Sequence, residues 1–161
     1  MKIKNKISIF ICTILIFNLT IKNLPAETPV YILNAIKLTY KDNNKIIIAE
    51  GGASAKDQFG KVIYSDLIIY DKINNLIKTQ SNSKYIDTKG NEIDANEFFY
   101  DLNIKKIKAI NNVKYKEKDG NIFLFSEFEY FEDSNKGFGK NVKGLLIDKS
   151  SFDKLYICFH Y

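Results

Sequence analysis

Residues 107–121 read Ile-Lys-Ala-Ile-Asn-Asn-Val-Lys-Tyr-Lys-Glu-Lys-Asp-Gly-Asn, and this stretch decides the fold. Every second residue from Ile107 to Tyr115 is apolar, small or an amide, while lysines dominate the positions between them. Because side chains alternate between the two faces of a strand, the pattern predicts a half-buried antiparallel strand. Gly120 follows, and glycine tolerates the positive φ angle of a hairpin turn, so we expect the chain to reverse there.

The pattern of this stretch recurs along the chain with a step of thirty residues. Five columns keep the step: tyrosines, turn glycines, acidic residues three positions before the glycines, small residues nine positions after the tyrosines, and polar residues four positions before them. Five columns in register predict an internal repeat. The columns are Tyr40, Tyr70, Tyr100 and Tyr130; Gly60, Gly90 and Gly120; Asp57, Asp87 and Glu117; Ala49, Thr79 and Ala109; and Asp66, Asn96 and Ser126.

Each unit is predicted to hold two strands joined by turns. The first strand ends on the tyrosine, as in residues 66–70, and an Asn- and Asp-rich turn follows it. The second strand alternates between an inner and an outer face. Its inner face is predicted to hold Ile47, Ala49, Gly51, Ala53 and Ala55 in the first unit, Ile77, Thr79, Ser81, Ser83 and Tyr85 in the second, and Ile107, Ala109, Asn111, Val113 and Tyr115 in the third.

The fourth unit departs from the pattern. Phe131 is expected to shift the register by one residue, residues 136–142 keep only the outline of the second strand, and the repeat stops after Ile147. The tail from Leu155 to Tyr161 reads as an apolar strand with an open edge, which is an aggregation-prone way to end a chain. We therefore expect the regular sheet to extend through three units and to weaken in the fourth.

The inner face mixes small residues with aliphatic and aromatic ones. A compact sandwich core normally closes over large aliphatic side chains from two sheets. Small residues that alternate with aromatics favour a narrow groove with room left in it, and a thin sandwich core is the alternative. Periodicity alone does not choose between these two interpretations.

The first 26 residues are predicted to form an export segment. Residues 1–6 hold three lysines, an apolar run covers residues 7–19, and Ala26 offers a small residue for cleavage. This run is shorter than the roughly 20 apolar residues that span a bilayer. An uncleaved helical anchor remains the alternative, and in either case we expect residues 27–161 to form one domain outside the cytoplasm.

The remaining composition excludes several classes of function. Four of the 24 lysines lie in or beside the export segment, which leaves 20 lysines against 19 acidic residues. A nearly neutral domain lacks the basic patch that nucleic acid requires, so no nucleic-acid partner is expected. His160 is the single histidine, and no catalytic triad, metal-ligand cluster or phosphate loop can be assembled. We expect no enzyme, no metal and no cofactor.

The repeat unit resembles the OstA-like family of periplasmic lipopolysaccharide-transport proteins, which includes the bridge protein LptA and the N-terminal domain of the outer-membrane assembly protein LptD. The resemblance rests on a tyrosine followed by Asp or Lys, an alternating second strand, and an acidic residue three positions before a glycine. It covers about residues 30–147, with its matching stretches at residues 35–55, 65–85 and 95–115.

This resemblance implies an all-β fold, an open β-jellyroll made of one folded-over antiparallel sheet. It further implies a periplasmic lipid-binding module that holds the acyl chains of lipopolysaccharide and joins other jellyroll proteins of the transport system edge to edge. The rival interpretations are a purely structural repeat protein and a non-functional truncated remnant of the outer-membrane assembly protein. The residues predicted to contact lipid are Ile47, Ala49, Ile68, Tyr70, Ile77, Phe98, Tyr100, Ile107, Ala109 and Phe128.

Overall fold

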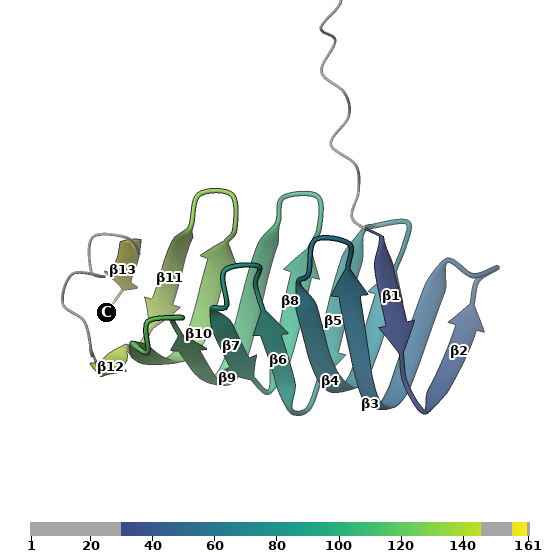
Figure 1. Cartoon of the computed structure of the whole chain (residues 1–161), viewed down its shortest axis with the longest axis horizontal. Helices are drawn as coiled ribbons and strands as arrows, with labels where there is room; N and C mark the ends of the chain where they lie inside the picture. Colours follow the sequence, from purple (N-terminus) through teal and green to yellow (C-terminus); the bar gives the residue numbers. More distant parts are fainter. Residues whose placement is uncertain (1–29, 146–155, 161) are drawn as a thin grey trace, which may run out of the picture.

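The computed structural model describes residues 30–145 and 156–160, and every element in these ranges is a β-strand (Figure 1). The predicted export segment, residues 1–26, lies outside the described residues. No helix that could cross a membrane occurs in the described ranges. The strands, in chain order, are β1 Tyr31–Asn34, β2 Lys37–Lys41, β3 Ile46–Asp57, β4 Val62–Asp71, β5 Leu76–Gln80, β6 Ser83–Ile86, β7 Glu92–Ala95, β8 Glu97–Asp101, β9 Lys106–Lys116, β10 Ile122–Phe131, β11 Lys136–Lys140, β12 Lys143–Leu145 and β13 Tyr156–His160.

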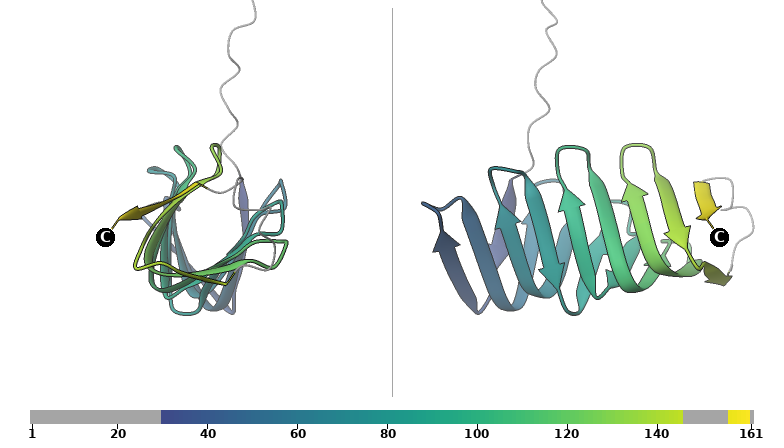
Figure 2. Two further views of the ribbon diagram at one scale, coloured as in Figure 1. Left: turned by 90° about the vertical axis from the view of Figure 1, so that its left-hand side faces the viewer. Right: turned by 180° about the vertical axis from the view of Figure 1, so that it is seen from behind.

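All thirteen strands belong to one sheet, which folds over on itself. The long strands β3, β4, β9 and β10 run through both halves of the fold, and the sheet has a U-shaped profile when viewed along its length (Figure 2). One half, the tyrosine layer, contains β2, β5, β8, β11 and the adjoining halves of the long strands. The other half, the glycine layer, contains β1, β6, β7, β12 and the remaining halves. The predicted all-β, folded-over antiparallel sheet is confirmed.

The corner between the layers is built from pairs of residues with left-handed backbone. Gly51 and Gly52 have φ angles of 82° and 72°, and Asn111 and Asn112 have 62° and 56°. Each pair lies opposite a single residue of the neighbouring strand, so the register shifts there, as between Glu50 and Ala53. Such a bulge bends and twists the strand, and glycine and asparagine are the residues that adopt this backbone most easily.

These corners correct part of the predicted inner face. Gly51, Ser81 and Asn111 are exposed at the bends instead of pointing inward. The second strand of the second unit is also divided at its corner into β5 and β6. Because each corner occupies two residues of the second strand, the alternation resumes in phase, and Ala53, Ser83 and Val113 are buried as predicted.

The glycine-centred turns are confirmed. Gly60, Gly90 and Gly120 have φ angles of 98°, 87° and 95°. The acidic column closes these turns: Asp87 Oδ1 accepts hydrogen bonds from the backbone N–H groups of Lys89 and Asn91, at 2.7 and 2.9 Å. Asp57 Oδ1 likewise accepts from the backbone N–H groups of Phe59 and Lys61, at 2.9 and 2.8 Å. These two acids therefore satisfy backbone donors of their turns that would otherwise be unpaired.

The fourth unit keeps its register, so the predicted shift at Phe131 is wrong. Tyr130 pairs with Ile107 on one side and with Gly137 on the other, as Tyr70 pairs with Ile47 and Ile77. Gly137 and Gly139 therefore occupy the positions that hold Ile107 and Ala109 in the preceding unit. A Cβ atom at Gly139 would lie 2.1 Å from Cδ1 of Phe125, and one at Gly137 would lie 2.5 Å from Cε2 of Phe128. The glycines are there because two aromatic rings cover them.

The two ends of the repeat differ from the predicted pattern. Tyr40 pairs with Ile47 but stays 55% exposed, since β2 is the edge strand of the tyrosine layer. The predicted strand in the tail is confirmed as β13, but its edge is not open on both sides, because Tyr156–His160 pairs in parallel with β11. The first strand of each unit also continues one residue past its tyrosine, to Asp71, Asp101 and Phe131.

Candidate functional site: the apolar interior and its polar rim

All ten side chains predicted to contact lipid lie between the two layers. Their exposed fractions run from 0% for Ala49, Ile68, Ala109 and Phe128 to 8% for Ile47 and Tyr70, and they belong to one hydrophobic core. They form two rows across the tyrosine layer. In one row tyrosine alternates with isoleucine, as in Tyr100 between Ile77 and Ile107. In the other row large residues alternate with small ones, so that Ala109 lies between Phe98 and Phe128.

The interior is closely packed in this conformation. The small residues lie next to large ones, and aromatic rings from the two layers meet across the interior. The rings of Tyr85 and Tyr100 are 5.9 Å apart in an edge-on arrangement, and those of Tyr115 and Tyr130 are 6.1 Å apart. A ligand chain could therefore enter only by separating the layers. Contact of the ten residues with lipid stays a prediction.

The glycine layer supplies the opposing half of the core, which the predicted set of lipid contacts omitted. Its buried residues include Ile63, Tyr85, Ile93, Tyr115 and Phe123, and none of these five is more than 6% exposed. Tyr85 and Tyr115 already belong to the predicted inner face. The others could have been found from the short alternation that follows each turn glycine, as in residues 62–65, where Ile63 and Ser65 are buried.

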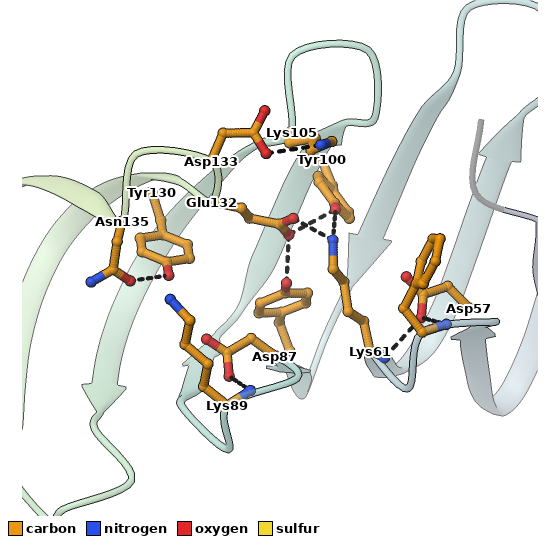
Figure 3. A network of polar contacts seen from close by, with 12 residues as sticks. Asp57, Lys61, Asp87, Lys89, Tyr100, Lys105, Tyr130, Glu132, Asp133 and Asn135 are labelled. Carbon is orange, nitrogen blue, oxygen red and sulfur yellow. Dashed lines mark hydrogen bonds and ion pairs between the residues drawn. The ribbon is translucent and has the colours of Figure 1, made fainter. Parts of the chain in front are cut away.

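A polar cluster closes the open side of the folded sheet (Figure 3). Glu132, in the turn after β10, accepts hydrogen bonds on Oε1 from the hydroxyls of Tyr85 and Tyr100, at 2.5 and 2.7 Å. Its other oxygen forms an ion pair with Lys61, which lies in the turn before β4. The side chain of Lys61 is only 16% exposed, and that of Glu132 is 10% exposed. This rim cluster thus joins the tyrosine layer to the glycine layer with a nearly buried ion pair.

The repeat itself shows that Lys61 is a departure. At the equivalent positions, Asn91 donates a side-chain hydrogen bond to Asp87 Oδ2 at 2.7 Å, and Asn121 donates one to Glu117 at 2.7 Å. Lysine at position 61 directs its amine to Glu132 instead. As a result the buried Oδ2 atom of Asp57 has no hydrogen-bond partner.

Glu132 lies at a place where the units carry different residues. Its backbone N–H donates to the carbonyl of Lys105 at 3.1 Å, as the backbone N–H of Leu102 donates to the carbonyl of Asn75 at 2.9 Å. The two residues therefore occupy equivalent places, and the leucine is 3% exposed in the core. The same backbone hydrogen bond is made by Lys72, whose N–H donates to the carbonyl of Lys45 at 2.9 Å, so the residue type at this place differs from unit to unit. In this unit it is an acid, and the acid contacts the one lysine that replaces an asparagine. Sequence reasoning missed this pair. The available signal was Lys61, at a place where the next two units hold asparagine.

The tyrosine hydroxyls of the rim are hydrogen-bond donors. Burial raises the pKa values of Tyr85 and Tyr100 far above the ordinary range, and the negative charge of Glu132 raises both further. Tyr31, 7% exposed, also has a raised pKa because of burial; the nearby Tyr100 hydroxyl opposes the increase, while Asp57 and Glu132 add to it. The buried hydroxyl of Tyr31 has no hydrogen-bond partner.

The outer face of the sheet carries ion pairs between neighbouring strands. Lys108 pairs with Glu127 at 2.8 Å, and Lys84 pairs with Glu92 at 2.8 Å. These lysines lie at alternate positions, as predicted, but their charges are balanced by carboxylates of neighbouring strands. Across residues 30–143, whose side chains are described, no group of three or more His, Cys, Asp or Glu could hold a metal ion.

The folded antiparallel sheet with an apolar interior is an open β-jellyroll. One of 14 matching chains of solved structures is LptH, described as the LptA-homologous periplasmic component of the conserved lipopolysaccharide transport device of Pseudomonas aeruginosa. The two folds superpose with a TM-score of 0.66 over 74% of this chain and 96% of that chain, at 11% sequence identity. This likeness shows the fold. No family model and no curated protein matches the sequence.

Proposed function

We propose that this chain is a periplasmic lipid-binding module of lipopolysaccharide transport, which holds acyl chains between its two layers and joins partner jellyroll proteins edge to edge. The observation that carries the proposal is the interior: two continuous apolar faces that are covalently joined along one side only. The fold shared with LptH supports the same role. No catalytic step is part of this proposal.

The interior suits an acyl chain on energetic grounds. Removing apolar surface from water contributes roughly 25 cal/mol per Å², or about 0.8 kcal/mol for each buried methylene. This attraction is not directional, so a chain is held without being fixed at one position. The aromatic and aliphatic rows run across successive strands, and a chain could therefore keep its apolar contacts while it moves along the sheet.

The edge at the N-terminal end of the sheet suits a partner strand. Beside Tyr40, the edge strands β1 and β2 expose large apolar side chains, with Ile32 at 66% and Leu38 at 38%. A sheet edge presents unpaired backbone donors and acceptors and is a template for another strand. At the opposite end, β11 is already paired with β13.

Photo-crosslinking tests the interior directly. A photoreactive phenylalanine at position 98 or 107 should capture acyl chains of lipopolysaccharide, because Phe98 and Ile107 are 1% exposed between the layers. The same group at Lys78 or Lys108, on the outer face, should not. Position 99 is the matched control for position 98, since Phe99 is the next residue and is 40% exposed on the outer face. Equal labelling from both faces would contradict the proposal.

The close packing favours one rival, a structural repeat protein whose interior binds nothing. Ala49 and Ala109 are 0% exposed because their neighbours fill the space around them. Mass spectrometry of the purified full chain separates the two functions. Lipopolysaccharide that co-purifies with the wild type, and is lost when Phe98 is replaced by aspartate, supports transport, whereas a lipid-free protein supports the structural role.

A further inference from the structure

The rim cluster contains a set of hydrogen-bond donors that converge on one carboxylate. We propose that Lys61, Tyr85 and Tyr100, together with the unpaired hydroxyl of Tyr31, form an anion site that Glu132 fills in the free protein. The ligand is the phosphate or carboxylate head group of an amphiphile, which displaces Glu132 when its chain enters the interior. This assignment rests on the proposed function, because the chain is held in the same interior.

The donors come from separate elements and meet at one point. Lys61 precedes β4, Tyr85 lies on β6 and Tyr100 lies on β8. The lysine also lies 3.4 Å from the Tyr100 hydroxyl, so the cation and the hydroxyls form one cluster. Two hydroxyls and an ammonium that are largely removed from water need an anion, and Glu132 supplies it.

Tyr31 provides an independent sign that the site is built for more than Glu132. Its hydroxyl is buried and unpaired, although a buried polar atom without a partner is costly and uncommon. Its ring meets that of Tyr70 across the interior, with the ring centres 6.2 Å apart, so the hydroxyl belongs to the same tyrosine-lined interior as the cluster. A phosphate has more acceptor oxygens than a carboxylate, and it can therefore accept this additional hydrogen bond.

The repeat argues that the ion pair is not there for stability. Asparagine at position 61 would match Asn91 and Asn121 and offer Asp57 a hydrogen bond, and leucine at position 132 would match Leu102, which lies in the core. Replacing a buried ion pair with packed apolar residues is often neutral or stabilising. The charged pair instead lies where the layers part, so an amphiphile with its chain in the interior would have its head group at this rim.

Isothermal titration calorimetry on the full chain tests the site with three probes: decyl phosphate, the uncharged decyl maltoside, and inorganic phosphate. The variants are Lys61→Met, which removes the cation, and Glu132→Gln, which removes the competing anion. We expect Lys61→Met to weaken decyl phosphate binding about tenfold or more, and Glu132→Gln to strengthen it severalfold. The affinity for decyl maltoside should be the same in the two variants.

The decisive result is that Lys61→Met and Glu132→Gln change the affinity for decyl phosphate in opposite directions. If the cluster only holds the two layers together, both variants open the rim. Both variants then change the affinities for decyl phosphate and decyl maltoside in the same direction, and this result would overturn the anion site. Tyr100→Phe keeps the ring and removes one donor, so it should weaken decyl phosphate binding alone; circular dichroism confirms that each variant is folded. An unchanged decyl phosphate affinity in this variant and in Lys61→Met would also overturn the assignment.

The probes also separate this inference from the proposed function. If decyl maltoside binds to no variant, the interior does not accept chains and the proposed function fails. The anion site then depends on inorganic phosphate, which must bind to the wild type and less well to Lys61→Met. Binding of decyl phosphate without binding of inorganic phosphate identifies an amphiphile head group as the source of the anion; binding of both identifies free phosphate as a ligand as well.

Discussion

Replacing the two rim charges with residues found at equivalent places elsewhere in the repeat should reveal how strongly these charges depend on each other. We consider Glu132→Leu, which restores the residue type found at Leu102, and Lys61→Asn, which restores the type found at Asn91. Each single variant removes half of an ion pair whose side chains are 16% and 10% exposed. The double variant removes both charges and leaves no unpaired ion.

The free energies follow from the contacts. Glu132→Leu leaves an ammonium and two buried hydroxyls without their acceptor, which should lower the free energy of unfolding by about 3 kcal/mol. Lys61→Asn leaves Glu132 with two tyrosine donors and offers Asp57 the missing side-chain hydrogen bond, so its cost should be about 1 kcal/mol. The double variant leaves no unpaired charge, but the two tyrosine hydroxyls still lack their acceptor, so it should cost about 2 kcal/mol, which corresponds to a coupling of about 2 kcal/mol.

Urea denaturation followed by circular dichroism measures all four proteins. Equal m values would show that the variants expose the same surface on unfolding, so that differences in midpoint report stability. Lys140→Ala, at an exposed ion pair with Glu127, is the control and should change stability by less than about 1 kcal/mol. If the double variant loses the sum of the two single costs, the charges are independent and the reasoning is refuted.

Three further predictions concern the turns and the core. Gly139→Ala should cost about 1–3 kcal/mol in urea denaturation, because the Phe125 ring lies where the new Cβ would be; an unchanged midpoint would show that the ring moves freely. Asn112→Val should cost about 1–2 kcal/mol at its φ of 56°, while Asn112→Gly should cost almost nothing, and equal losses would contradict the role of left-handed backbone. Alkaline titration should unfold the protein above pH 10, because buried tyrosines with raised pKa values stay neutral in the folded state, while those of the unfolded chain ionise from their ordinary pKa of 10.0. Each such tyrosine lowers the free energy of unfolding by about 1.4 kcal/mol per pH unit in this range. Complete tyrosinate absorbance with an unchanged circular dichroism spectrum would contradict this prediction. These tyrosines are Tyr31, Tyr85, Tyr100, Tyr115 and Tyr130.

Local regularities in the sequence carry most of the fold. Alternation placed Ile107 and Tyr115 on the buried face, and the glycine column located the turns, because both features depend only on near neighbours in the chain. Asn111 was misplaced for the same reason. On β9 the alternation passes through the corner in phase, so counting by two along this strand does not show that the chain bends there. On β10 the buried positions shift by one at the corner, from Phe125 to Phe128.

Other misinterpreted features depend on contacts between strands. Gly137 and Gly139 look like a decayed strand until the rings of Phe128 and Phe125 are seen to cover them. Lys61 and Glu132 are 71 residues apart, and no local pattern joins them. The interior could be predicted as a set of residues, whereas its closed packing and its charged rim required the arrangement in space.

The thirty-residue step has a consequence for length. Each unit adds two strands to each layer, and neighbouring strands lie about 4.8 Å apart, so one unit lengthens the interior by roughly 10 Å. The number of units therefore sets the length of a bound molecule that the interior can cover. Duplication or loss of one unit would change that span in whole steps, without altering the cross-section of the U.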